Sequence, residues 1–448
     1  MHSNLVPSED RIFAWIEEIF TRGIRRPGYP ADRWTEDWLQ QQFRAFGLER
    51  VRTEPVEVPY WEPRRATLTI GSGDTTLDIP CFPLPHSAPA ERLEAEAIDF
   101  DPARPEAVRG AFSLYDVVLT RVPQTVLQSR AIWSYDPDGT YASTRQILPF
   151  GREIQNVMEP SIAAGAAGFI GVLPDYPGDS NQYYVPYDAV ERPIPGVWIS
   201  RSDRERVGGL LTDEAPRAQL TVDSIRENIT SHNIVGEFPG ADEDMVIIGS
   251  HHDGPWASAV EDGSGIALVL AQAAYWSQVP QADRPHRLLF LLNAGHMAGG
   301  AGQRTFVEDH AAELDNVVLE LHLEHAANEF SDETGLLAPT GNPESRWWFT
   351  SLIPRLQDAV RSAIEAEDLR RSMVVPPTMF GPKPTTDGAD FYPAGVPLVN
   401  YLTAPFYLFD AMDTLDKIHR GSLVPVTRAA VRIIESTTGV SAFAMRAG

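Results

Sequence analysis

The sequence contains a single cysteine, Cys81, among its 448 residues. One cysteine excludes an intramolecular disulfide and any cysteine-rich zinc module, so a metal ion in this protein would have to be bound by histidine and carboxylate side chains. Basic residues are also few: Lys and Arg number 37 against 62 Asp and Glu, and the formal net charge is −25. This charge excludes the basic surface by which proteins bind nucleic acids, and it disfavours polyanionic partners.

Long hydrophobic runs are missing as well. The strongly apolar stretch IALVLAQAAYW, from Ile266, is well short of the roughly 20 residues that a membrane helix needs. The opening segment, MHSNLVPSEDRIFAWIEEIF, lacks the basic and apolar regions of a secretory signal. We therefore expect a cytoplasmic protein with neither a membrane nor a nucleic acid as partner.

The length and composition predict a large folded protein. Hydrophobic residues make up 43% and charged residues 22% of the sequence, which is ordinary usage for a globular chain. The 448 residues exceed the roughly 250 to 300 at which a single core stops growing, so we expect two domains or one domain with an insertion. The sequence leaves open whether the protein forms a homo-oligomer.

The pattern of apolar residues changes twice along the chain. Helical spacing from Asp10 to Leu48 predicts two opening helices, and short β-rich runs divided by Pro and Gly predict an inserted β-rich domain over residues 80–222. From Ile234 onward, nearly continuous apolar strands alternate with helices. This alternation is typical of an α/β fold in which a mostly parallel mixed sheet is covered by helices on both faces.

The predicted alternation continues to the end of the chain. A helix is expected within WWFTSLIPRLQDAVRSAIEA, from Trp347, and a short strand in VPLVNYL. A last helix is expected over residues 424–438.

Histidines cluster in the α/β part. Seven of the 11 histidines lie between residues 251 and 325, namely His251, His252, His286, His296, His310, His322 and His325. Several of them, together with Asp253 and Glu324, follow or end predicted strands, and the carboxyl ends of parallel strands meet at one edge of a sheet. Alternation along LHLEH places His322 and Glu324 on one face and His325 on the other, so at most two of these three are expected to point the same way.

These motifs resemble metallopeptidase family twenty-eight, the co-catalytic zinc aminopeptidases and carboxypeptidases. The matching runs lie within residues 234–418 and read NIVGEFPG, VIIGSHHDGPWASAVEDGSG, FLLNAGHMAGGAGQRTF, LHLEH, ADFYPAGVPL and AMDTLDKI. Residues 80–222 resemble the protease-associated domain that members of this family often carry as an insertion. The resemblance implies the first part of a catalytic domain at 1–79, this insertion at 80–222, and the catalytic α/β domain at 223–448.

Members of the family bind two zinc ions with five ligands. By the resemblance, His251 stands at the first histidine ligand, and Asp253 at the aspartate that orients it. Glu261 replaces the aspartate that bridges the two ions, and Glu324 replaces a further aspartate ligand. Because His251, Glu261 and Glu324 are suitable ligands and together serve the first ion of the family, that ion is expected to be retained.

The second ion of the family is expected to be lost. Met297 replaces its glutamate ligand and Phe409 its histidine, so both side chains are expected to fill the space of the lost ion. His296 stands where the family has its general base, and it is predicted to be a base, a metal ligand or a buried structural group. Since glutamate is longer than aspartate, His296 or His322 could also reach a displaced ion. We expect one divalent ion, zinc in the first place, with iron and manganese as alternatives.

Each assignment has a plainer alternative. His251 could be a hydrogen-bonded core histidine, and Glu261 a solvated loop acid before the next helix. Asp387 stands in TDG where the family reads Ser-Asp-His, so a histidine of the pocket is missing. A larger set is expected to support the ligands or to line the substrate pocket: His252, His322, His325, Asp387, Trp256, Tyr392, Asn400 and Tyr407.

The leading functional prediction is a metal-dependent hydrolase of an amide or peptide-like bond in a small-molecule or short peptide-like substrate. The metal would polarise the carbonyl group, and His296, with a reference pKa near 6.5, would accept a proton at neutral pH; Asp253 is the second catalytic candidate. In one alternative, His251, His296 and one carboxylate hold iron for redox or lyase chemistry. In the other, the chain is a catalytically inactive binding or assembly protein.

Overall fold

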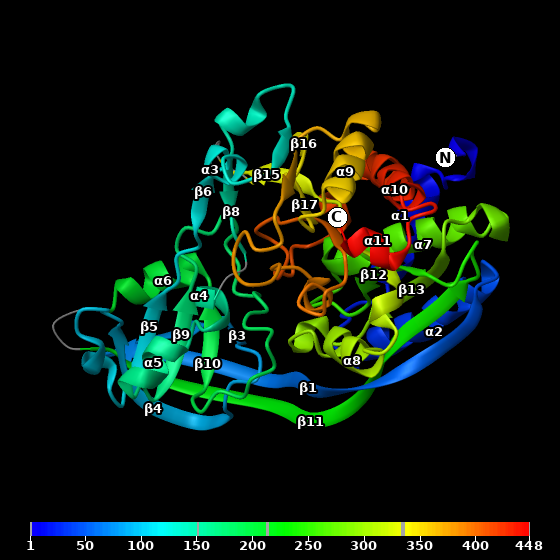
Figure 1. Ribbon diagram of the computed structural model, residues 1–448. Helices are drawn as coiled ribbons and strands as arrows, with labels where there is room; N and C mark the ends of the chain where they lie inside the picture. Colours follow the sequence, from blue (N-terminus) through cyan, green and yellow to red (C-terminus); the bar gives the residue numbers. More distant parts are fainter. Residues whose placement is uncertain (1, 150–151, 212–214, 333–336, 448) are drawn as a thin grey trace.

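A mixed sheet runs through the whole molecule. The computed structural model describes residues 2–149, 152–211, 215–332 and 337–447, and within them this sheet contains 15 strands (Figure 1). Two long strands, β1 (Glu49–Ser72) and β11 (Arg217–Phe238), pair antiparallel along most of their length. They extend beneath both lobes of the molecule and join the α/β part to the β-rich part (Figure 1).

Parallel strands form the centre of the α/β part. They are β12 (Met245–His251), β13 (Arg287–Asn293), β14 (Val317–Leu323) and β19 (Leu398–Thr403), in the order β13-β12-β14-β19. On one side β11 pairs antiparallel with β13, and on the other β17 (Arg346–Thr350) pairs antiparallel with β19 and parallel with β18 (Ser372–Val375). The central strands are buried almost throughout, so they require cover on both faces.

Helices provide this cover. One face is packed by α1 (Glu9–Phe20), α2 (Pro30–Ala45), α7 (Gly265–Trp276), α9 (Pro354–Ala366) and α10 (Arg420–Glu435). On the opposite face, Phe306 of α8 (Ala301–Asp309) packs with Val235, Ile247 and Leu289. A mixed sheet with helices on both faces confirms the predicted α/β fold class.

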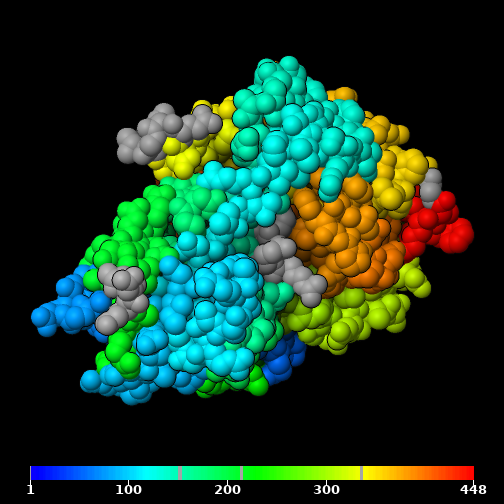
Figure 2. All heavy atoms as spheres, turned by 90° about the vertical axis from the view of Figure 1, so that its left-hand side faces the viewer, coloured from blue at the N-terminus to red at the C-terminus, as the bar shows by residue number. Residues whose placement is uncertain are grey.

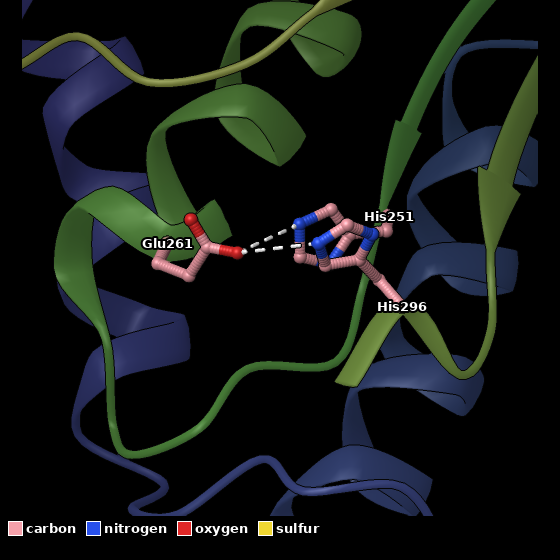
Figure 3. Close-up of side chains that lie close together, drawn as sticks. All are labelled: His251, Glu261 and His296. Atoms are coloured by element: carbon pink, nitrogen blue, oxygen red, sulfur yellow. Dashed lines mark ion pairs between the residues drawn. The ribbon is translucent and has the colours of Figure 1, made fainter. Parts of the chain in front are cut away.

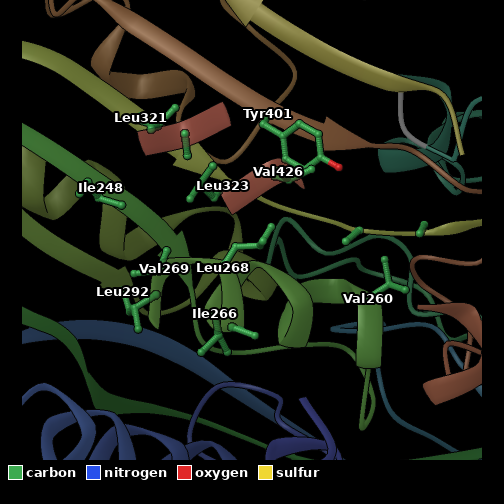
Figure 4. Close-up of a cluster of buried hydrophobic side chains, with 14 of the residues drawn as sticks. Ile248, Val260, Ile266, Leu268, Val269, Leu292, Leu321, Leu323, Tyr401 and Val426 are labelled. Atoms are coloured by element: carbon green, nitrogen blue, oxygen red, sulfur yellow. The ribbon is translucent and has the colours of Figure 1, made fainter. Parts of the chain in front are cut away.

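Helix α7 is the centre of the larger core. All of its residues are buried, because GIALVLAQAAYW is apolar around the whole helix. Figure 4 shows Ile248, Leu292 and Leu321, from three neighbouring strands, gathered with Ile266 and Val269 of this helix. The strand ends that precede and follow α7 are therefore held by one continuous apolar layer.

The β-rich part continues the sheet beyond β11. Its strands are β2 (Thr75–Ile79), β3 (Cys81–Pro83), β4 (Ala90–Asp99), β5 (Phe112–Asp116), β9 (Gly168–Val172) and β10 (Gly196–Ile199), with the helices α4 (Arg152–Gln155), α5 (Glu159–Ala164) and α6 (Arg201–Gly208). The domain boundaries at 80 and 222 stay predictions. Residue 222 lies inside β11, so that strand belongs to both parts of the sheet.

An arm from the β-rich part reaches back to the far edge of the α/β sheet. It comprises β6 (Arg121–Pro123), α3 (Gln124–Gln128), β7 (Trp133–Tyr135) and β8 (Arg145–Ile147). β7 pairs antiparallel with β18, and Figure 2 shows the teal atoms of this arm against yellow and orange atoms of the α/β part. A small sheet of β15 (Asn328–Ser331) and β16 (Ala338–Pro343) lies nearby.

The later elements differ in part from their predictions. The helix expected after Trp347 begins only at Pro354, since Trp347, Trp348 and Phe349 belong to β17 and are buried. The last long helix, α10, is followed by α11 (Ala442–Arg446). Among the described residues, no helix combines the length and the apolar character needed to cross a membrane.

Candidate metal centre

The ends of three neighbouring parallel strands bring the predicted ligands together. His251 is the last residue of β12, His296 opens the turn of residues 296–298 after β13, and Glu324 follows the last residue of β14. Glu261 lies in the segment that leads into α7. The four residues thus meet at the carboxyl edge of the sheet, where binding sites of α/β folds lie.

His251, Glu261 and His296 form the first group of candidate ligands (Figure 3). Nε2 of His251 lies 3.4 Å from Oε1 of Glu261, and Nε2 of His296 lies 3.8 Å from the same oxygen. The two imidazole rings stack with their centroids 4.3 Å apart. One ligand atom from each residue lies within 4.8 Å of the others, so a single ion can reach all three.

Asp387 extends this group to four donors. Its Oδ2 lies 3.1 Å from Nε2 of His251, and its Oδ1 lies 3.2 Å from Nε2 of His296. Neighbouring donors around a tetrahedral zinc ion with bonds of about 2.0 to 2.1 Å are roughly 3.3 Å apart. The distances from Asp387 to the two imidazole nitrogens are close to this value, so Asp387 is a further candidate zinc ligand. Sequence reasoning placed Asp387 only among supporting or pocket residues.

The hydrogen bonding of His251 also fits an absent ligand. The residue is buried, and neither ring nitrogen has a hydrogen-bond partner among the described residues, although carboxylates lie nearby. Its Nδ1 lies 3.7 Å from Oδ1 of Asp253, the predicted orienting residue. A buried imidazole whose contacts with carboxylates lack hydrogen-bond geometry is costly, and a metal bond from Nε2 would relieve this cost.

Backbone contacts hold the segment that carries Glu261. The carboxylate of Asp413 accepts hydrogen bonds of 2.9 Å from the backbone N–H of both Val260 and Glu261. The buried guanidinium of Arg25 donates to the carbonyl oxygens of Ser258 and Glu261 at 2.9 Å and 3.3 Å. No residue pattern marks Arg25 in the sequence, because its partners are backbone carbonyls distant in the chain.

Asp253 holds the turn that carries His296. Its two carboxylate oxygens accept the backbone N–H of His296 at 3.0 Å and of Met297 at 2.7 Å. Asp253 therefore positions His296, in addition to its proximity to His251.

The charges of the first group differ from residue to residue. Burial acts to raise the pKa of Asp387, but the neighbouring His296 and His251 outweigh it and bring this pKa to about 2. Burial likewise opposes ionisation of Glu261, but His325 and His251 hold its pKa well below the usual range. Burial lowers the pKa of His296, which favours the neutral imidazole that a metal ligand or a general base requires.

Glu324 lies in a second group of candidate ligands, with His322 and Asp387. One ligand atom from each lies within 4.8 Å of the others. The strand β14 ends at Leu323, so the alternation of side chains does not extend to Glu324 and His325. The expectation that at most two of His322, Glu324 and His325 point the same way stays a prediction. Nε2 of His325 lies 2.6 Å from Oε2 of Glu261, so His325 also contacts a candidate ligand.

The other predicted residues serve different contacts. Both ring nitrogens of His252 are engaged, Nδ1 at 2.8 Å from Asp32 and Nε2 at 2.9 Å from the carbonyl oxygen of His232. The indole N–H of Trp256 donates to the carbonyl oxygen of Phe409 at 3.0 Å. The hydroxyl group of Tyr407 donates to the carbonyl oxygen of Asn328, and the side-chain amide of Asn400 donates to Glu324. Tyr392 is half-buried and follows the turn of residues 389–391.

Met297 and Phe409 are packed among apolar side chains. Both are buried, and the ring of Phe409 stacks on Tyr187 with centroids 4.7 Å apart. Tyr187 in turn lies 5.6 Å from the ring of His296. These contacts agree with the packing role expected for the two residues that replace ligands of the family.

The α/β part of the chain is similar in sequence to known peptidases. The family model described as "Peptidase family M28" matches residues 233–434. The probable leucine aminopeptidase 2 of Aspergillus oryzae is 25% identical over 312 residues, which are 66% of this chain and 53% of that protein. The leucine aminopeptidase 2 of Arthroderma otae is 24% identical over 52% of this chain and 39% of that protein. The chain thus spans about half or less of the curated relatives it matches.

Solved structures share the fold over nearly the whole chain. A peptidase M28 precursor from Shewanella amazonensis superposes with a TM-score of 0.70 at 20% identity, and covers 96% of this chain and 97% of its own. A zinc aminopeptidase from Bacillus subtilis superposes with a TM-score of 0.66 at 17% identity, and covers 95% of each chain. Residues 233–434 thus match the model of peptidase family M28, and the solved structures show that this chain shares their fold.

Proposed function

We propose that the chain is a metal-dependent hydrolase of peptide or amide bonds, with one tightly held zinc ion. The observation that carries this proposal is the approach of the imidazoles of His251 and His296 to the carboxylates of Glu261 and Asp387, at nitrogen–oxygen separations of 3.1 to 3.8 Å. The family match and the aminopeptidase relatives support the reaction class. When bound, zinc supplies Lewis-acid activation of a carbonyl group and of water.

The residues of the chain hold and shape this site. His251, His296, Glu261 and Asp387 would bind the ion. Asp253 and Asp413 would fix the backbone of two of these ligands through the hydrogen bonds described above. We assign His296 to the ligands because its Nε2 faces both carboxylates of the first group.

The burial of the site supports a small substrate. The side chains of His251 and Glu261 are almost fully buried, whereas those of His296 and Asp387 are 16% and 9% exposed. A substrate would therefore approach from the side of His296 and Asp387. We propose a small-molecule or short peptide-like substrate on this ground.

Metal analysis of protein purified without a histidine tag tests this proposal. We expect about one zinc ion per chain after extensive dialysis. Hydrolysis of aminoacyl p-nitroanilides, starting with the leucine derivative, should stop on treatment with a chelator and return on addition of zinc. The variant His251→Gln should lose both the zinc and the hydrolysis, whereas His286→Gln, a buried histidine with both ring nitrogens bonded elsewhere, should lose neither.

The same measurement separates the alternatives. Iron in place of zinc would favour the mononuclear iron enzyme, since His251, His296 and Glu261 are also a set of two histidines and one carboxylate. A protein without metal and without activity would be a binding or assembly protein on this fold. Either result would contradict the proposed hydrolase.

A further inference from the structure

A buried histidine with one free ring nitrogen lies outside the first group. His322 is on β14 and has no exposed surface. Its Nδ1 lies 2.8 Å from Oε1 of Glu320, two residues earlier on the same strand, and its Nε2 has no hydrogen-bond partner in the described part of the chain. A carboxylate that accepts the Nδ1 proton leaves the lone pair on Nε2, which is the arrangement found behind many metal-binding histidines.

The Glu320–His322 pair packs closely against two glycines, and a side chain at either glycine would collide with it. A Cβ atom at Gly249, on the neighbouring strand β12, would lie 2.9 Å from Nδ1 of His322 and 3.1 Å from Oε1 of Glu320. A Cβ atom at Gly388 would lie 3.1 Å from both Oε2 of Glu320 and Cβ of His322. Two glycines on different segments thus accommodate the Glu320–His322 pair, so the pair is held in a fixed position.

Two carboxylates lie close to His322. Ligand atoms of Glu324 and Asp387 lie with one of His322 within 4.8 Å of one another. Oε1 of Glu324 accepts the backbone N–H of Asp387 at 3.2 Å and a hydrogen bond from the side-chain amide of Asn400. These two bonds fix the carboxylate of Glu324 and leave its Oε2 outside them.

The local charge balance also calls for a cation. Carboxylates gather here inside the protein, where an uncompensated charge is costly. They are Asp253, Glu261, Asp262, Glu320, Glu324, Asp387 and Asp413. When the histidines that bind metal are neutral, Arg25 offsets only part of this charge.

We propose that His322, Glu324 and Asp387 bind a second divalent cation, with Asp387 shared between the two ions. One imidazole and two carboxylates suit zinc, cobalt or manganese. This position differs from that of the second ion implied by the resemblance, whose ligands are replaced by Met297 and Phe409. The second ion binds more weakly than the first, since it has three donors and shares one of them. The sharing of Asp387 rests on the proposed first site; the binding at His322 does not.

Metal titration of the whole protein tests the proposal. Chelator-treated protein is dialysed against buffers of graded free zinc, and the bound metal is measured by elemental analysis. Two equivalents are expected, the first retained at much lower free zinc than the second. His322→Gln should abolish the second equivalent and keep the first, and Glu320→Gln should weaken the second by about 10- to 100-fold. His286→Gln is the matched control, since His286 also pairs with a carboxylate, at 2.8 Å from Asp242, but has its Nε2 bonded to Thr437.

Spectroscopy tests the sharing of Asp387. Protein loaded with two equivalents of manganese should show spin coupling between the ions by electron paramagnetic resonance, and His322→Gln should show only an isolated ion. Saturation of the wild-type protein at one equivalent, or a second equivalent that persists unchanged in both His322→Gln and Glu320→Gln, would overturn the second site. A wild-type protein that holds no tightly bound equivalent would instead contradict the proposed function. Circular dichroism shows whether each variant is folded. If His322→Gln does not fold, Glu320→Gln still tests the second site.

Discussion

Asp413 offers a sharp test of how the metal centre is held, because it touches none of the proposed ions. In Asp413→Asn the size of the side chain is kept, but one carboxylate oxygen becomes an NH2 group that cannot accept a hydrogen bond. Oδ1 accepts the N–H of Val260 at 2.9 Å, and Oδ2 accepts those of Val260 at 3.2 Å and Glu261 at 2.9 Å. An NH2 group therefore removes either the shorter bond of Val260 or the bond of Glu261, and in the second case the N–H of Glu261 loses its acceptor. An unsatisfied buried group costs about 1 to 3 kcal/mol.

This cost should appear in metal affinity. If the backbone of Glu261 relaxes away from the amide, zinc binding must force it back. At 1.4 kcal/mol for each factor of ten, the dissociation constant for the first zinc should rise about 5- to 150-fold. Competition with a chromogenic zinc chelator measures this change directly.

Asp416→Asn provides the matched control for Asp413→Asn. Asp416 lies three residues further on, its side chain is 62% exposed, and it pairs with Lys417. Surface substitutions of this kind change stability by less than about 0.5 kcal/mol, so zinc affinity should stay within about twofold. An Asp413→Asn protein that binds zinc as tightly as this control would refute the role assigned to Asp413.

Three further predictions follow from single side chains. His296→Ala should lower the affinity for the first zinc ion by more than about 100-fold, which exceeds the effect of losing a supporting residue. A variant that keeps its zinc but hydrolyses slowly would make His296 the general base instead. Burial lowers the pKa of His86 to about 4, below its unfolded value of about 6.5. The free energy of unfolding should therefore reach its full value above pH 6.5 and fall by up to about 3 kcal/mol toward pH 4. His86→Gln should flatten this denaturant profile, and an unchanged slope would contradict the assignment. Burial raises the pKa of the Cys81 thiol to about 12, so iodoacetamide at pH 8 should label the native protein more than about 100-fold more slowly than the denatured one, as measured by mass spectrometry.

Much of the α/β part could be predicted from local patterns. The strands β12, β13 and β14 are apolar throughout, and α7 is apolar around its whole circumference, so burial on both faces of the sheet follows from the sequence. The extent of β17 could not be predicted in this way. Trp347, Trp348 and Phe349 are compatible with a buried helix or a buried strand, and only the pairing with β19 decides between them.

Long-range contacts limited the prediction of the site. Strand ends predicted that His251 and His296 lie together, because this depends only on the order of parallel strands. The approach of Asp387 to His251 depends on the path of a segment over 130 residues later in the chain, which no local pattern encodes. The contact of Glu320 with His322 is different, because the two residues are two apart on β14 and the alternation along this strand places them on one face.

Candidate donors are distributed unevenly around His296. On one side of His296, Phe409 and Tyr187 stack their rings, which leaves an apolar wall where the resemblance would place a metal-binding histidine. On the other side, Asp387 faces the Nε2 atoms of both His251 and His296, and it also belongs to the group of His322. Asp387 stands at the aspartate of the family's Ser-Asp-His, so this side keeps its carboxylate while the side chain of Phe409 offers no donor. The arrangement therefore favours a metal centre displaced toward β14, the strand that carries His322.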